Sequence, residues 1–195
     1  MRTNYEKLIL KHSYPIFEDL ELLKQAINNI PLDLSEIHIT KGVSLFEVET
    51  NKEDSKLTVI IDKNLIQFTF KNELDYSLIK VIFESFPVEF NSTFKLPLLL
   101  IEGNIDKDAK KENFNHLLNF SNGNFGLKHI GVDYSISDNH YKITSTIRKN
   151  DINISLRIPL KVNIDKLNEK INLAKTELYD EVLPAFNKFI GSEKK

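Results

Sequence analysis

The chain has 195 residues, a formal net charge of −2, 41% hydrophobic residues, 28% charged residues and no cysteine. This balance is typical of a folded globular protein and excludes a chain too polar to form a core. The absence of cysteine excludes disulfides, thiol catalysis and thiolate metal sites. The near-neutral charge provides no general basic field, which argues against nucleic acid as a partner.

The distribution of apolar residues also bears on the compartment. No run approaches the roughly 18 consecutive apolar residues that a membrane helix needs. Near the N-terminus, Leu8–Leu10 is followed at once by Lys11, so this stretch is too short for a signal peptide. We expect a cytoplasmic protein with no membrane partner. Frequent Asn, Ile, Lys and Phe without Trp are typical of an AT-rich bacterial or phage genome.

The first half of the chain predicts two helices that flank a group of strands. Residues 1–13 suggest a polar lead-in or an edge strand. Apolar residues at three- and four-residue spacing predict a helix from Pro15 to Ile30, and a second helix is expected between a cap at Asn72 and Pro87. Period-two alternation and turn residues predict the intervening strands at 36–40, 43–50, 57–61 and 65–70.

The second half repeats this order. After an irregular crossing segment at 88–104, we expect a helix at 106–121 and strands at 127–137, 140–148 and 152–158. A long amphipathic helix then begins near Asn163, and Pro184 interrupts it. Each half is therefore predicted to contain a helix, then three or four strands, then a second helix.

These patterns predict an α+β protein with a largely antiparallel sheet and helices packed on one face. The N-terminal half, residues 1–104, includes the connector, and the C-terminal half comprises residues 105–195. We expect the two α-βββ-α halves to share one core.

No motif for catalysis or cofactor binding is present. The five histidines lack metal-ligand spacing, no GxSxG occurs, and the six glycines form no phosphate-binding loop. Glu47 and Glu49 alternate on one strand and Asp62 ends another, a pattern that exposed strand faces carry for solubility. We predict no catalytic, cofactor-binding or metal-binding residue, and no cofactor. The protein is therefore expected not to be an enzyme.

Features for protein binding are better supported. Phe90 and Phe94 lie in a short Phe-rich span, and Phe186, Phe189 and Ile190 form an apolar turn after Pro184. We interpret these five residues as candidate partner-binding residues. The alternative is that the last turn closes the protein's own core. The partner would be another protein, bound by strand addition or helix docking, and a homodimer is a further option.

The closing half resembles the type III secretion chaperone-like superfamily, which includes small bacterial sensory regulators. The likeness is carried by Phe114–Asn119, the strand His140–Arg148, the alternating run Ile154–Leu160 with its Pro159, and the helix that begins near Asn163. The resemblance implies a compact, acidic, dimeric protein that binds extended partner segments without catalysis. This chain is longer and nearly charge-balanced.

The sequence thus favours a non-enzymatic protein-binding module of a bacterium or phage: a chaperone, an adaptor or an immunity/antitoxin-type protein. The alternative is a small-molecule or nucleotide binding domain that uses a cavity between the sheet and the long helix.

Overall fold

The fold is given by a computed structural model, which describes residues 2–12, 19–49, 56–72, 75–87, 95–104, 129–136, 139–146, 151–157 and 164–190. The strands are β1 (Arg2–Lys11), β2 (Leu34–His38), β3 (Val43–Glu49), β4 (Lys56–Asp62), β5 (Leu65–Lys71), β6 (Lys95–Asn104), β7 (His129–Ile136), β8 (Asn139–Thr146) and β9 (Asp151–Arg157). The helices are α1 (Leu20–Asn28), α2 (Tyr76–Glu84), α6 (Ile164–Glu177), the π-helical turn η2 (Leu178–Val182) and α7 (Leu183–Ile190).

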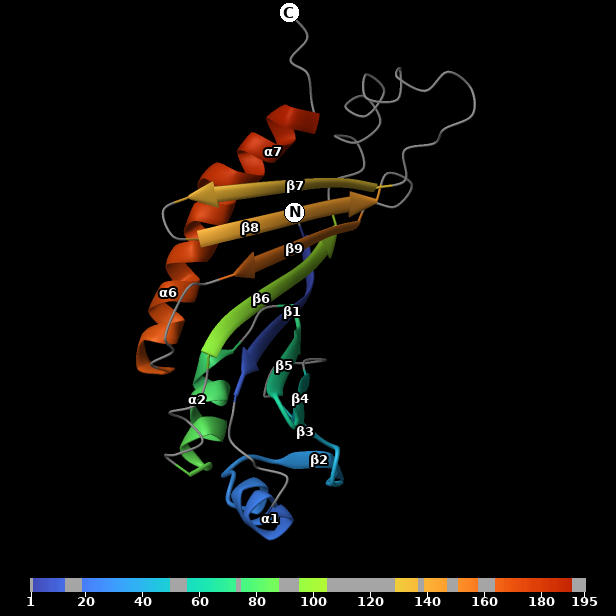
Figure 1. Ribbon diagram of the computed structural model, residues 1–195, viewed down its shortest axis with the longest axis vertical. Coiled ribbons are helices and arrows are strands. Elements are labelled where there is room, and N and C mark those ends of the chain that lie inside the picture. The colour runs from blue at the N-terminus through green and yellow to red at the C-terminus, as the bar shows by residue number, and fades with distance from the viewer. Residues whose placement is uncertain are drawn as a thin grey trace, which may run out of the picture.

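Within these residues the nine strands form one sheet in the order β2-β3-β4-β5-β1-β6-β9-β8-β7. Every neighbouring pair is antiparallel. Figure 1 shows α2 and α6 along one side of this twisted sheet, with α1 at the β2 end and α7 beside β7. The predicted α+β fold with an antiparallel sheet and helices on one face is confirmed.

The strand order has an internal regularity. In the first half, β3, β4 and β5 form a meander that ends beside β1; in the second half, β7, β8 and β9 form a meander that ends beside β6. The two first strands, β1 and β6, then pair with each other and join the halves into one sheet, with Leu8 opposite Leu99. The division into halves at residues 104 and 105 stays a prediction.

The first strand differs from its prediction. β1 is neither a lead-in nor an edge strand, because it pairs with β5 on one side and with β6 on the other. Its Leu8 and Leu10 are fully buried, and so is Glu6. Lys175 of α6 reaches the Glu6 carboxylate at 2.7 Å, so an ion pair accommodates a polar residue that had suggested an exposed strand.

The core lies between the sheet and the helices. Alternate residues of each strand point into it, as in β4, where Leu57, Val59 and Ile61 are buried. The buried helix residues belong to the same cluster, among them Leu23 and Ile27 of α1, Ile79, Ile82 and Phe83 of α2, and Leu167, Ile171, Ala174 and Leu178 of the C-terminal helices.

Two helices begin later than the sequence predicts. Asp19 caps α1, where its side chain accepts a hydrogen bond from the Leu22 amide at 2.9 Å, and residues 13–18 lie outside the described part of the chain. Asp75, rather than Asn72, caps α2. Asn72 has a φ of 69°, a left-handed conformation that ends β5. The helix predicted at 106–121 lies outside the described residues.

The interruption at Pro184 takes a specific form. A proline inside a helix donates no N–H, and its ring collides with the carbonyl four residues earlier. Here the π-helical turn Leu178–Val182 directly precedes α7 and widens the backbone around Asp180, so the helical path continues through the proline. Among the described residues, no helix is long and apolar enough to cross a membrane.

Candidate protein-binding surface

The sheet face that points away from the core is called here the open face. On β3, β4, β5, β1 and β6, the residues between the buried positions are partly or fully exposed. Tyr5 and Val43 on this face are 45% and 49% exposed, and both are among the large exposed hydrophobic residues. No described helix covers this face (Figure 1).

The strand register brings apolar residues of the open face into one line. Leu45 is paired with Ile60, Ile60 with Gln67, Gln67 with Ile9, and Ile9 with Leu98. This line, called the apolar row, crosses five neighbouring strands and has four aliphatic side chains with a glutamine at its centre. Consecutive residues of the row are between 7 and 89 positions apart in the sequence, so the row is a product of strand register rather than of any local motif.

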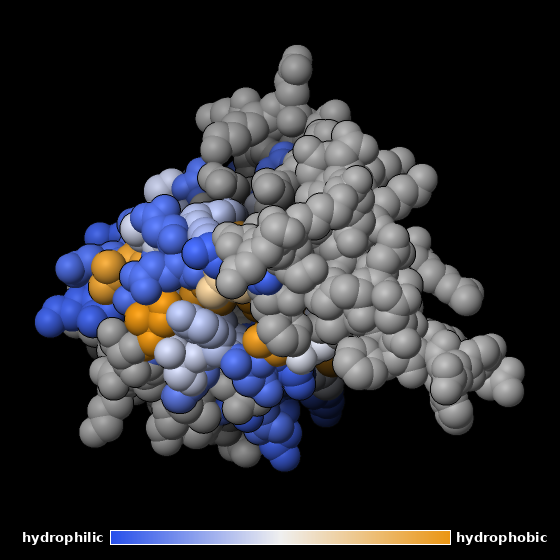
Figure 2. Space-filling model, turned by 90° about the horizontal axis from the view of Figure 1, so that it is seen from above, coloured by the Kyte–Doolittle hydropathy of each residue, from blue (hydrophilic) through white to orange (hydrophobic). Residues whose placement is uncertain are grey.

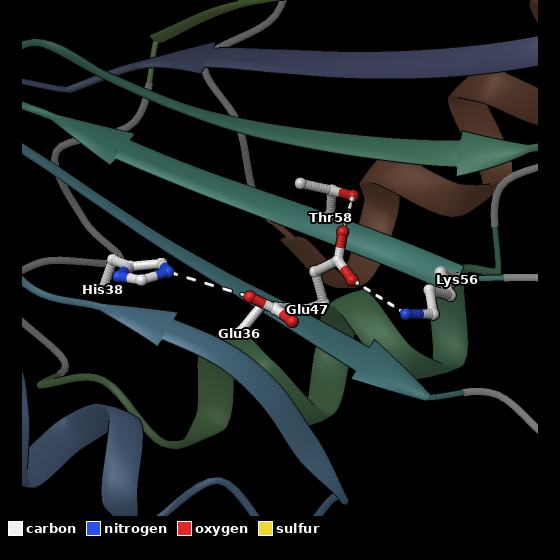
Figure 3. A network of polar contacts seen from close by, with 5 residues as sticks. All are labelled: Glu36, His38, Glu47, Lys56 and Thr58. Atoms are coloured by element: carbon white, nitrogen blue, oxygen red, sulfur yellow. Dashed lines mark hydrogen bonds and ion pairs between the residues drawn. The ribbon is translucent and has the colours of Figure 1, made fainter.

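Charged side chains border the apolar row. Glu47 of β3 accepts hydrogen bonds from Lys56 at 3.1 Å and from Thr58 at 3.3 Å, both on the neighbouring β4, and His38 of β2 lies 3.8 Å from Glu36 (Figure 3). The carboxylate of Glu47 raises the pKa of Lys56 above its ordinary value, so the amine stays charged. The predicted role of the strand acids as solvent-facing groups agrees with these contacts.

The described acids and histidines do not gather into a metal-binding cluster. No group of three or more described His, Asp and Glu side chains is placed to hold a metal ion. His12 is buried and its Nε2 lies 3.0 Å from the carbonyl oxygen of Asp62, whereas His140 is exposed and its Nδ1 lies 2.9 Å from the Ser135 hydroxyl. The Ser135–His140 contact joins the neighbouring strands β7 and β8, and both residues are exposed.

The first outer edge of the sheet, β2, carries features that hinder pairing with another strand. Its register with β3 shifts between Ser35 and His38, which marks a bulge or irregularity. Glu36 within it has a φ of 50°, and the Glu36 and His38 side chains are exposed and charged or polar. Short, irregular and charged edge strands are the usual protection against edge-to-edge association.

The other outer edge, β7, carries one exposed charged residue, Asp133, but lacks the register shift and the positive-φ residue of β2. Its eight residues pair with β8 without a register shift, and they include no proline and no lysine. Val132, Tyr134 and Ile136 pack partly buried against the core, while Gly131, Asp133 and Ser135 are exposed on the open face. No described strand pairs with the outer side of β7. Viewed from this end of the molecule, the described surface shows hydrophobic patches among hydrophilic residues (Figure 2).

The predicted partner-binding residues fall in different places. Phe90 and Phe94 lie outside the described residues. Phe186 is only 2% exposed and belongs to the core cluster, as the alternative interpretation of the last turn requires. Phe189 and Ile190 belong to α7, and their side chains lie outside the described set. Phe186 therefore lies in the core, and the partner-binding role of the other four residues stays a prediction.

The space between the second half of the sheet and α6 is occupied by side chains. Tyr141 and Ile143 of β8 and Ile154 of β9 are buried there together with Leu167 and Ile171 of α6. The Tyr141 hydroxyl lies 2.7 Å from the Glu177 carboxylate and 3.1 Å from the Ala174 carbonyl. These contacts tie β8 to the end of α6, and they give no support to a ligand cavity at this place.

Sequence reasoning missed both the apolar row and the free edge of β7. The row depends on which strands are neighbours, and β1 and β6 were not recognised as the central pair. The edge had a weak local signal, since the segment 127–137 lacks proline and contains only Lys128 and Asp133 as charged residues.

No protein-family model matches the sequence, and no curated protein is significantly similar to it. The function is therefore argued from the surfaces described above.

Proposed function

We propose that this protein is a non-enzymatic protein-binding module, of the chaperone, adaptor or immunity-protein kind, which takes an extended segment of its partner as an additional strand beside β7. The observation that carries the proposal is the contrast between the two sheet edges. β2 is short and has a register shift and a residue of positive φ, whereas β7 pairs with β8 over eight residues without a register shift, a proline or a lysine.

Strand addition supplies affinity and selectivity by different means. The outward N–H and C=O groups of β7 can form main-chain hydrogen bonds with any extended segment. Every second partner side chain would lie beside Val132, Tyr134 and Ile136, which are partly buried, and the others beside Gly131, Asp133 and Ser135, which are exposed. We expect a partner segment that alternates apolar and polar residues.

The resemblance of the closing half to the type III secretion chaperone-like superfamily supports the same proposal, because it implies binding of extended partner segments without catalysis. Strand addition also agrees with the predicted mode of partner binding. The cavity-based alternative has no specific observation in its favour.

The test is capture of the partner from the native host with a variant that blocks the edge. In Gly131→Lys/Ser135→Lys, two lysines stand on the exposed side of β7, where a Cβ on Gly131 would meet only Thr144 Cγ2 at 3.6 Å, an ordinary contact. We expect the wild-type chain to retain one protein in stoichiometric amount and the variant to lose most of it. In the captured complex, backbone amides of β7 should gain protection from hydrogen exchange.

The matched control is Leu173→Lys/Tyr179→Lys, which adds the same charge at two exposed positions of the C-terminal helices, 52% and 38% exposed. This control should capture the partner as well as the wild-type chain does. Equal capture by the β7 variant, or protection that appears elsewhere while β7 exchanges as before, would show that the proposal is wrong.

A further inference from the structure

We propose that the partner segment lies antiparallel to β7, in the place that β2 takes beside β3 in the first half, with apolar side chains opposite Ile136 and Tyr134. This arrangement rests on the proposed function, and it adds the direction, the register and the chemistry of the strand that β7 accepts. It follows from a residue-by-residue correspondence between the two halves of the sheet.

The two halves extend outward from the central pair in the same way. From the centre, the strands follow in the order β1, β5, β4, β3 in the first half and β6, β9, β8, β7 in the second. β1 and β6 are antiparallel, so a half-turn about an axis through the sheet between Leu8 and Leu99 exchanges the halves. The register rows that start from this pair are Leu8, Phe68, Val59 and Phe46 in the first half and Leu99, Leu156, Tyr141 and Tyr134 in the second.

The next row agrees with the same half-turn. Its residues are Leu10, Ile66, Ile61 and Ser44 in the first half and Ile101, Ile154, Ile143 and Val132 in the second. Residues of β3 and β7 therefore correspond one to one. Phe46 corresponds to Tyr134, and Val48 corresponds to Ile136.

The place beyond β3 is filled, whereas the corresponding place beyond β7 holds no described strand. β2 lies beside β3 and antiparallel to it, with Leu34 opposite Val48 and partly buried against the core. Phe46 and Val48 are fully buried, but Tyr134 and Ile136 are only partly buried. A strand in the corresponding place would cover these two side chains, and an apolar residue opposite Ile136 would take the role of Leu34.

The main-chain groups of β3 identify the free groups of β7. The Glu49 amide donates a hydrogen bond to the Asp33 carbonyl at 3.1 Å, so it is the exposed residues of β3 that direct their amides toward β2. Main-chain groups of a strand alternate between its two sides with the same period as the side chains. By the correspondence, Gly131, Asp133 and Ser135 direct their N–H and C=O groups to the free side of β7.

The probe for this place is a synthetic peptide with the sequence of residues 32–40 without Glu36. Glu36 has a φ of 50° and lies in the register shift of β2, so its omission removes the bulge. Placed antiparallel on β7, the remaining Leu34, Ser35, Ile37, His38 and Ile39 fall opposite Ile136, Ser135, Tyr134, Asp133 and Val132. Apolar side chains then face the partly buried residues of β7, and the histidine faces the exposed aspartate.

Direction is measured with a nitroxide on the first residue of the peptide in one sample and on the last residue in another. Gly131 and Ile136 lie about 17 Å apart in a strand that rises about 3.4 Å per residue, so NMR resolves which of their amide signals is broadened. We expect the first label to broaden the Ile136 signal most and the last label to broaden the Gly131 signal most. At saturating peptide, the amides of Gly131, Asp133 and Ser135 should gain protection from hydrogen exchange.

The matched control is a peptide of the same composition in which Leu34 exchanges places with Ser35, and Ile37 with His38. It should bind at least about tenfold more weakly, because polar side chains then face Ile136 and Tyr134. The variant Gly131→Lys/Ser135→Lys should lose the peptide.

Three results would overturn the proposed arrangement: the reverse order of broadening, equal binding of the two peptides, or β7 signals that the peptide leaves unchanged. The proposed function survives these results if the partner captured from the host still protects the β7 amides. Protection of Gly131, Asp133 and Ser135 already in the free chain would mean that the chain itself fills this place, and both proposals would then be wrong.

Discussion

Glu6 has no exposed surface although it lies on the central strand β1, and the Lys175 amine meets it at 2.7 Å from the far side of the core. A buried charge of this kind depends on its partner, because the desolvation of the carboxylate is otherwise uncompensated. The pair joins residues 169 positions apart and connects the first strand with the last long helix.

We predict that Lys175→Met lowers the free energy of unfolding by about 3–5 kcal/mol, because it removes the charged amine that contacts the buried Glu6 carboxylate. Urea denaturation followed by circular dichroism measures the change. The double variant Glu6→Leu/Lys175→Met should regain most of the loss, since apolar residues of similar volume can replace a buried pair. Lys170→Met, at an exposed position of the same helix, is the control. A loss below about 1 kcal/mol for Lys175→Met would contradict the assigned role.

At the scale of elements, β8 and α6 are held together by a buried tyrosine. Tyr141 is 1% exposed, and its hydroxyl lies within hydrogen-bond distance of Glu177, which also accepts from the Asn139 amide at 2.8 Å. Burial, followed by the neighbouring Glu177 carboxylate, raises the pKa of Tyr141 well above its ordinary value. The folded state therefore favours the neutral phenol over the phenolate.

This shift predicts a dependence of stability on alkaline pH. A raised pKa in the folded state means that the contribution of Tyr141 is fully present below the pKa of an unfolded tyrosine, near 10, and is lost as the pH rises above that value. The advantage of the wild-type chain over Tyr141→Phe should therefore fall above pH 10, by at most about 1.4 kcal/mol per pH unit. Denaturation of both chains at pH 8, 10 and 11 measures this difference. A difference that stays constant over the range would show that Tyr141 ionises as freely in the folded state as in the unfolded one.

Elements with one buried and one exposed face were predictable from the sequence. β4 and β5 alternate strictly between buried and partly exposed residues, so their period-two patterns placed them within a residue or two. β1 and β6 were not predicted as the central pair. β1 contains Glu6, and a charged residue normally indicates an exposed strand. β6 contains Pro97 within an apolar run, and a proline normally indicates an edge strand or an irregular segment.

The candidate surfaces were less accessible from the sequence for a related reason. The apolar row joins Ile9, Ile60 and Leu98, residues that only the order of strands makes neighbours. Periodicity shows which face a residue occupies but not which strand lies next to it. Phe186, which its place after Pro184 had suggested for partner binding, is buried in the core.

At the scale of the molecule, the two halves meet through the pairing of β1 with β6, and one continuous cluster of buried residues extends across that junction. Leu8 and Leu99 face each other at its centre, and both are fully buried. If the halves share one core, a cavity at the junction must weaken both of them together.

We therefore predict that Leu99→Ala lowers the free energy of unfolding by about 2–5 kcal/mol, the usual result of truncating a buried leucine. Hydrogen exchange under native conditions should show the amides of β4 in the first half and of β8 in the second losing protection by the same amount. Leu173→Ala, at a 52% exposed position, should change stability by less than about 0.5 kcal/mol. Loss of protection in one half alone would instead mean that residues 1–104 and 105–195 unfold separately, and that the sheet is continuous in geometry without being a single cooperative unit.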